Sequence, residues 1–134
     1  MSLRRKAREY ALQMLFEWEI GRQPCGGVEK GFWRNARAEK ATRAFANQLF
    51  EGAVAEAAAL DALIGRHAEN WRLERMAAID RAILRLGVYE LRAAETPPRV
   101  VINEAVELAK KFSSEEAAPF INGILDAIYK SGEK

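Results

Sequence analysis

The sequence predicts an all-α protein of about seven helices. Apolar residues recur at three- and four-residue spacing through most of the chain, and this spacing gives a helix one apolar face. No segment shows the sustained alternation of apolar and polar residues that is typical of a half-buried strand. Gly, Pro and short polar runs interrupt the helical spacing at residues 21–31, 96–98 and 113–116, which we interpret as breaks between helices.

The chain has 134 residues, enough for one domain that buries about two thirds of the surface of its unfolded chain. A single cysteine excludes an internal disulfide, and one His with one Cys excludes a typical structural zinc site. No apolar run approaches the roughly 20 residues of a membrane span, and the basic start leads into an amphipathic helix rather than a signal peptide. We therefore expect a cytoplasmic protein.

The first helix is predicted over residues 3–20 and has one broad apolar face that goes into the core. On the opposite side, Leu12 and Phe16 form an apolar pair beside Arg5 and Glu9. Two interpretations remain open for this pair. Either a second helix covers it, or an exposed aromatic side chain lies beside a basic cluster.

The middle of the chain is less sharply patterned. A break over residues 21–31 is followed by a short helix at about 28–35. Residues 38–65 are rich in Ala and free of Pro, which indicates one long helix bent near Gly52 or two abutting helices. Residues 67–71 then form a turn or a short helix.

Residues 76–95 form the central helix of the prediction. Its apolar residues occupy two sides of the helix, so we expect it to be buried on two sides. Arg81, Arg85 and Arg92 project into one sector beside Asp80. This sector predicts a single line of charge that faces water or a partner.

Glu90 is the one charged residue that falls among the apolar positions of the central helix. It is either hydrogen-bonded inside the fold or placed where a ligand binds. We favour a structural carboxylate that is satisfied by an Arg or by a neighbouring helix end. The expected donors are the free N–H groups at the start of the next helix, after Pro97 and Pro98.

Two helices are predicted after the stop at residues 96–98. Residues 100–112 carry an apolar face and place two lysines in the last turn, where the helix dipole favours them. A final helix runs over about 119–129, with Pro119 in its first turn. Gly123 lies inside this helix, and such a glycine usually permits the close approach of a neighbour.

The sequence contains no motif of an enzyme. It lacks a Gly-rich phosphate loop, paired histidines and a serine elbow, so we expect no catalytic residues, no metal and no cofactor. His67 is interpreted as a surface or capping residue. The strongest sign of function is a basic cluster whose side chains could each neutralise an RNA phosphate. Together they would give a slope of log affinity against log salt of roughly −3. Gln13 and Phe16 lie on the adjacent part of the helix. The cluster consists of Arg4, Arg5, Lys6 and Arg8.

Four segments together resemble the NusB family of bacterial transcription antitermination factors. They are RRKAREYALQMLFEWEI, DRAILRLGVYEL, VVINEAVELAKKF and FINGILD, in this order and spacing over nearly the whole chain. The resemblance implies two packed three-helix bundles, with the N-terminal bundle at about 1–70 and the C-terminal bundle at about 71–134. It also implies a heterodimer with the ribosomal protein NusE that binds boxA RNA in the elongation complex with other Nus factors, which supports ribosomal RNA synthesis.

The resemblance also implies roles for individual residues. RNA contacts fall on Arg4, Arg5, Lys6 and Arg8 and on a C-terminal surface around Phe112, Glu116 and Phe120. NusE contacts include Phe16 and Asp80.

Two other functions fit the same fold. NusB-like domains also precede the catalytic domain of ribosomal RNA cytosine methyltransferases, but we expect no such enzyme because this sequence contains no catalytic domain after the helices. A helical adaptor without RNA affinity or an antitermination role fits the composition equally well. A homodimer is compatible with the pattern too, because an apolar helix face can pack against a second copy.

Overall fold

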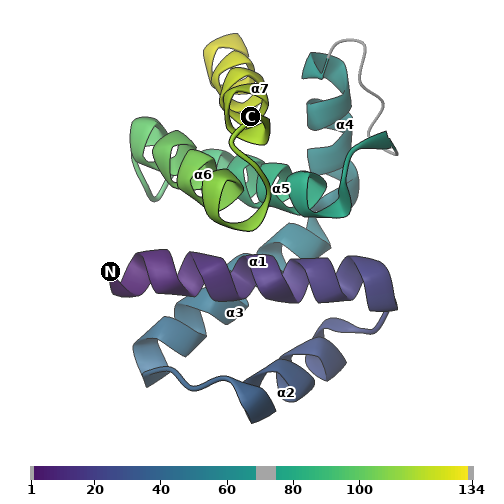
Figure 1. The fold of residues 1–134 in the computed structure, drawn as a ribbon, viewed down its shortest axis with the longest axis vertical. Helices are drawn as coiled ribbons and strands as arrows, with labels where there is room; N and C mark the ends of the chain where they lie inside the picture. The colour runs from purple at the N-terminus through teal and green to yellow at the C-terminus, as the bar shows by residue number, and fades with distance from the viewer. Residues whose placement is uncertain (1, 69–74, 133–134) are drawn as a thin grey trace.

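The computed structural model describes residues 2–68 and 75–132, and these residues form seven α-helices without a strand (Figure 1). This confirms the all-α prediction. The helices are α1 (Leu3–Gly21), α2 (Cys25–Asn35), α3 (Lys40–Ala55), α4 (Ala57–His67), α5 (Ala78–Ala93), α6 (Pro98–Phe112) and α7 (Ala117–Ser131).

Helix α1 runs through the middle of the molecule, with α2 and α3 on one side and α5 and α6 on the other (Figure 1). This position buries both sides of α1 and decides between the two interpretations of its apolar pair. Leu12 is fully buried, because other helices cover its side of α1. Phe16 keeps 37% of its surface exposed, near the C-terminal half of the same helix.

Helix α5 is the central element of the core. It packs against α1, α3, α4, α6 and α7, and its residues 82–88 are buried without interruption. The expectation that this helix is buried on two sides is therefore confirmed. The packing also accounts for the wide apolar surface of α5, which is stable only when neighbours cover it on both sides.

The helices pack as two groups along the chain. Helices α1, α2 and α3 contact one another, and α5, α6 and α7 form a second set of mutual contacts. Helix α4 packs against α5 and α7, on the same side of α1 as the C-terminal helices (Figure 1). Helix α4 follows the junction at Glu56, and the division into two bundles at about residue 70 stays a prediction.

Residues 38–65 follow the second of the two predicted alternatives, because they form two abutting helices. The break lies at Glu56, whose N–H donates to the carbonyls of Gly52 and Val54. Helix α2 begins at Cys25, three residues before the predicted start. In the predicted turn at 67–71, residues 69–71 lie outside the described residues.

Close helix approaches occur at two glycines, but not at the one that the sequence indicated. A Cβ added to Gly123 would meet no atom within 4 Å, so this prediction was wrong. At Gly52 the ring of Tyr89 occupies the space of the missing Cβ. At Gly87 a Cβ would lie 2.9 Å from Leu125 Cδ1, where α5 meets α7.

The arginines of α5 do not form an open line of charge, which corrects a second expectation. Arg85 is buried and donates to both carboxylate oxygens of Asp61, at 2.7 and 2.8 Å, and to Glu19 at 3.0 Å. Arg92 pairs with Glu56 at 2.8 Å. Arg85 is thus covered by acidic residues of α1 and α4, whereas the pair of Arg92 with Glu56 lies near the surface.

Candidate nucleic-acid interface

The first turn of α1 presents the basic cluster. Ser2 caps this helix by accepting a hydrogen bond from the N–H of Arg5 at 3.1 Å. Arg4 is exposed, and its guanidinium carbon lies 4.3 Å from the centre of the Phe45 ring on α3. Lys6 lies 5.0 Å from the centre of the Tyr10 ring and 3.7 Å from Glu9. Arg4 and Lys6 are therefore held over aromatic rings near the surface.

Arg5 is bound to a carboxylate of α6. Its Nε donates to Glu104 Oε1 at 3.1 Å, and its Nη2 donates to Glu104 Oε2 at 2.7 Å. The Arg5 side chain is 42% exposed, whereas that of Glu104 is 15% exposed. The hydrogen bond and the charge of Arg5 lower the pKa of Glu104 below its ordinary value, so this carboxylate remains charged at neutral pH.

Arg8 is the partner of Glu90. Its Nε and Nη2 donate to the two carboxylate oxygens at 2.8 and 2.9 Å, and only 4% of Arg8 is exposed. Glu90 is thus the structural carboxylate that we expected, but its donor is Arg8 and not the start of α6. Burial also removes Arg8 from the exposed basic surface that the sequence predicted, because the buried Glu90 needs its charge.

A third ion pair, between Glu9 and Lys111, also joins α1 to the C-terminal helices. Lys111 of α6 lies 3.0 Å from both carboxylate oxygens of Glu9. We call this set of contacts the ion-pair seam, which comprises Arg5, Arg8, Glu9, Glu90, Glu104 and Lys111. The seam joins α1 to α5 and α6. Among residues 2–68 and 75–132, no carboxylate lies within hydrogen-bonding distance of the other two cations of the cluster, Arg4 and Lys6.

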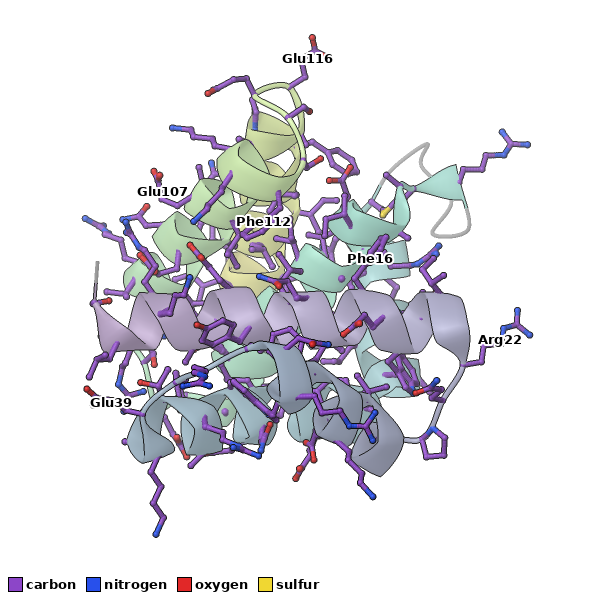
Figure 2. The ribbon with its side chains drawn as sticks, turned by 60° about the horizontal axis from the view of Figure 1, so that its bottom comes forward. Phe16, Arg22, Glu39, Glu107, Phe112 and Glu116 are labelled. Carbon is purple, nitrogen blue, oxygen red and sulfur yellow. The ribbon has the colours of Figure 1, made fainter. Side chains whose placement is uncertain are left out.

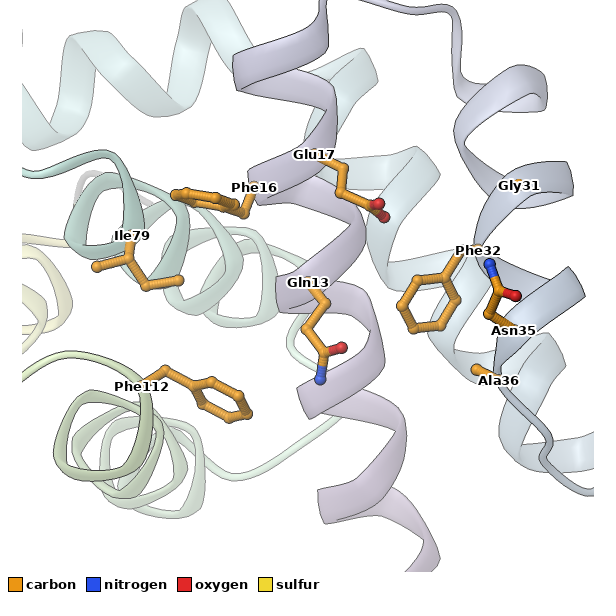
Figure 3. A pocket seen from close by; sticks show the side chains of 9 residues that line it. All are labelled: Gln13, Phe16, Glu17, Gly31, Phe32, Asn35, Ala36, Ile79 and Phe112. Atoms are coloured by element: carbon orange, nitrogen blue, oxygen red, sulfur yellow. The ribbon is translucent and has the colours of Figure 1, made fainter.

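A hollow of about 490 Å³ crosses α1 farther along the helix (Figure 3). We call it the aromatic groove because three phenylalanines line it. Figure 3 shows Phe16 and Phe112 on one side of Gln13 and Phe32 on the other. An adjoining hollow of about 470 Å³ continues along α2. The lining residues of the aromatic groove are Gln13, Phe16, Glu17, Gly31, Phe32, Asn35, Ala36, Ile79 and Phe112.

The groove brings together residues that the sequence assigned to different partners. Gln13 and Phe112 were predicted to contact RNA, and Phe16 was predicted to contact a protein. Asp80, the other predicted protein contact, follows the groove residue Ile79 in the first turn of α5. Its Oδ1 is buried and has no hydrogen-bond partner among the described residues. Ile79 gives the groove an apolar side chain in the same turn of α5, which suits a partner that carries apolar groups.

Two predicted RNA contacts lie apart from this groove. Glu116 is exposed at the corner between α6 and α7, far from α1 (Figure 2). Phe120 is only partly exposed and packs against the core. The RNA contacts of both residues stay a prediction.

Sequence reasoning missed two features of the site. Phe32 lies in a segment of weak pattern, and no signal pointed to its position in the groove. Glu104 lies on the predicted helix 100–112, but its pairing with Arg5 spans 99 residues and follows only from the packing of α6 on α1.

The described residues contain no cluster of three or more His, Cys, Asp or Glu side chains that could hold a metal ion. In the same part of the chain, every helix is too short or too polar to cross a lipid bilayer.

Comparison with known proteins gives a consistent result. The NusB family matches residues 5–130. The transcription antitermination protein NusB of Koribacter versatilis is 50% identical over 127 residues, which cover 93% of this chain and 87% of that protein. The corresponding protein of Solibacter usitatus is 48% identical over 130 residues and covers 96% and 89%.

Solved structures agree with this. A chain in the crystal structure of the antitermination factors NusB and NusE in complex with double-stranded RNA is 32% identical, with a TM-score of 0.87 over 98% of both chains. T. maritima NusB is 34% identical, with a TM-score of 0.85 over 95% of this chain and 90% of that chain.

Proposed function

The chain belongs to the NusB family, and from this premise we propose that it is an RNA-binding transcription antitermination factor. In this proposal it pairs with the ribosomal protein NusE, binds boxA RNA and supports ribosomal RNA transcription within an elongation complex that contains other Nus factors. It acts as a cytoplasmic binding protein and not as an enzyme.

One observation carries the proposal. The fold matches, over 98% of both chains, a protein from a complex of NusB, NusE and double-stranded RNA. Relatives that are about half identical over nearly the full length are named transcription antitermination proteins. At this level of identity and coverage, the shared fold and the shared function are expected to go together.

Two regions of the described surface support this proposal. We propose that RNA phosphates contact the first turn of α1, with Arg4 and Lys6 as the accessible cations. The aromatic groove offers apolar surface that reaches Ile79, the residue before Asp80, and this fits a protein partner anchored by Phe16. Gln13 and Phe112 line the same groove, and we propose that RNA and NusE meet there.

The test is binding by the full chain, alone and with NusE, to a boxA RNA and to an RNA of the same length with scrambled sequence. We expect a complex with NusE, and we expect the pair to prefer boxA with an affinity that falls as salt rises. Failure to bind boxA even with NusE present would refute the proposal and favour a helical adaptor. A homodimer that forms in place of the NusE complex would contradict it as well.

A further inference from the structure

Glu104 occupies the position that an RNA phosphate would take on Arg5. The carboxylate accepts two parallel bonds from the guanidinium, through Nε and Nη2. A phosphate binds arginine by the same two-pronged geometry. Arg5 therefore already has an anion on this edge in the free protein.

We propose that Glu104 competes with RNA phosphate for Arg5 and so acts as a specificity-determining residue of the RNA site. The inference rests on the proposed RNA-binding function. In the free protein Glu104 neutralises Arg5. When RNA binds, a phosphate replaces the carboxylate on the guanidinium.

The seam provides a second cation for the displaced carboxylate. Arg8 Nη1 lies 3.9 Å from Glu104 Oε1, next to its own pair with Glu90. Glu104 therefore keeps Arg8 as a nearby cation when Arg5 binds a phosphate. The exchange leaves no carboxylate stranded without a cation, which would otherwise oppose it strongly.

The competition lowers the affinity for any RNA by the same amount. An RNA held only by its phosphates has little else to compensate for the lost Arg5–Glu104 pair. An RNA that also makes base contacts retains those contacts. Glu104 thus weakens the binding of unrelated RNA, so that only an RNA that also makes base contacts binds tightly.

The competition also affects the salt dependence. A cation that neutralises one phosphate of single-stranded RNA contributes about −0.7 to the slope of log affinity against log salt. In the wild type, Arg5 exchanges one anion for another. Arg8 is shared between Glu90 and the freed Glu104, so one net negative charge remains there and attracts a cation from solution. Arg5 should therefore add almost nothing to the slope while Glu104 is present.

The test uses Glu104→Gln in the full chain, with RNA of scrambled sequence as the probe. We expect about fivefold tighter binding, which corresponds to the loss of a partly exposed ion pair, and a slope that is steeper by about 0.7. The matched control is Glu107→Gln, which removes the same charge from the same helix. Glu107 is half-exposed and lies 3.9 Å from Lys110, so its variant should change affinity by less than about twofold.

A double variant assigns the effect to Arg5. Adding Arg5→Ala to Glu104→Gln should abolish the gain in affinity and the gain in slope. Arg5→Ala alone should leave the wild-type slope unchanged, and this measurement decides the question even if Glu104→Gln does not fold.

Three outcomes contradict the inference. Binding by Glu104→Gln that is equal to or weaker than that of Glu107→Gln would mean that Glu104 only orients Arg5. A slope that flattens by about 0.7 in Arg5→Ala alone would mean that Arg5 is already free to neutralise a phosphate. If neither the wild type nor any variant binds RNA at low salt, the proposed function fails together with the inference. If the wild type binds RNA and Glu104→Gln binds it with the same affinity and the same salt slope, only the inference is overturned.

Discussion

The same kind of ion pair has different consequences at different depths in this molecule. Arg8 and Glu90 are both buried, and their pair joins α1 to α5. Removal of one partner leaves an uncompensated charge inside the protein, which costs about 3–5 kcal/mol. We therefore expect Glu90→Ala to lower the free energy of unfolding by about 3 kcal/mol in urea denaturation.

The control for Glu90 is an exposed pair on the same helix. Arg92 and Glu56 lie 2.8 Å apart near the surface. Arg92→Ala should lower stability by less than about 1 kcal/mol. Equal losses in Glu90→Ala and Arg92→Ala would show that burial does not set the value of these pairs.

The ion-pair seam changes the expected salt dependence of RNA binding. Four exposed cations would give a slope of roughly −3, but Arg8 is buried and Arg5 is neutralised by Glu104. Arg4 and Lys6 remain, and together they should contribute about −1.4. Replacing both by Ala should flatten the slope by that amount, measured by RNA affinity between low and high salt. An unchanged slope would place the phosphate contacts outside the first turn of α1.

Glu29 on α2 should make stability depend on pH. Burial, a hydrogen bond with Glu51 and the charge of that carboxylate raise the pKa of Glu29 from 4.5 to about 7. A raised carboxyl pKa means that the folded state holds a proton that the unfolded state has lost, so stability is present below pH 4.5 and is lost as pH rises towards 7. Glu29→Gln should remove this loss.

The measurement for Glu29 is thermal or urea unfolding of wild type and Glu29→Gln at pH 5 and pH 8. Between pH 5 and pH 8, we expect the free energy of unfolding of Glu29→Gln to rise by about 1 kcal/mol relative to that of the wild type. This is less than the free energy that corresponds to the full pKa shift, because the Glu29 carboxyl is only partly buried. Glu115→Gln, at an exposed position, should keep the wild-type profile. Parallel profiles for wild type and Glu29→Gln would contradict the assignment.

Single residues could be recognised as unusual from the sequence, but their partners could not. Glu90 stood out because a charge among apolar helix positions must be compensated. Its donor Arg8 is 82 residues away, and no local pattern specifies a contact across that distance. The same limit applies to Arg5 and Glu104.

At the scale of elements, periodicity predicted most of the helices to within a few residues. The breaks were less predictable, because the junction at Glu56 contains neither Gly nor Pro and depends on where α3 and α4 pack. For α1 the pattern could not show whether another helix covers Leu12. A helix with apolar residues on two sides is buried on both only if other helices pack on both, and the sequence does not say which helices do.

The glycines offer a direct test of helix packing. A Cβ at Gly52 would overlap the Tyr89 ring, which would have to shift, whereas Gly123 faces open space. Gly52→Ala should therefore destabilise the protein by about 1–3 kcal/mol through overpacking. Gly123→Ala should stabilise it by up to about 1 kcal/mol, because Ala favours the helix.

Urea denaturation of both glycine variants checks these values. The two substitutions are chemically the same and lie within helices, so the difference between them reports the space around the Cβ. A stable Gly52→Ala protein would mean that Tyr89 can shift away from α3 without loss.

At the scale of the whole molecule, the candidate site exists only because distant segments meet. The aromatic groove takes residues from α1, α2, α5 and α6. The sequence pattern pointed to Gln13, and the family resemblance pointed to Phe16 and Phe112. The packing of α1 between two groups of helices brings all three to one hollow (Figure 3). Phe32 enters the groove in the same way, since α2 folds back along α1.

The groove predicts that protein binding can be lost without loss of the fold. Phe16 is exposed at the groove, so Phe16→Asp places a charge on the proposed NusE surface without entering the core. Asp80→Lys reverses the charge beside the same groove. Each variant should weaken NusE binding by more than about 1 kcal/mol, as loss of an interface anchor or a reversed charge does.

The matched control for Phe16→Asp is Val100→Asp. Val100 is an exposed apolar residue on α6 and does not line the groove. Calorimetric titration with NusE and thermal unfolding of the same samples separate the two effects. We expect Phe16→Asp to lose affinity at wild-type thermal stability, while Val100→Asp keeps both. If Phe16→Asp unfolds the protein, its ring is part of the core, and if both variants bind NusE as the wild type does, NusE binds away from the aromatic groove.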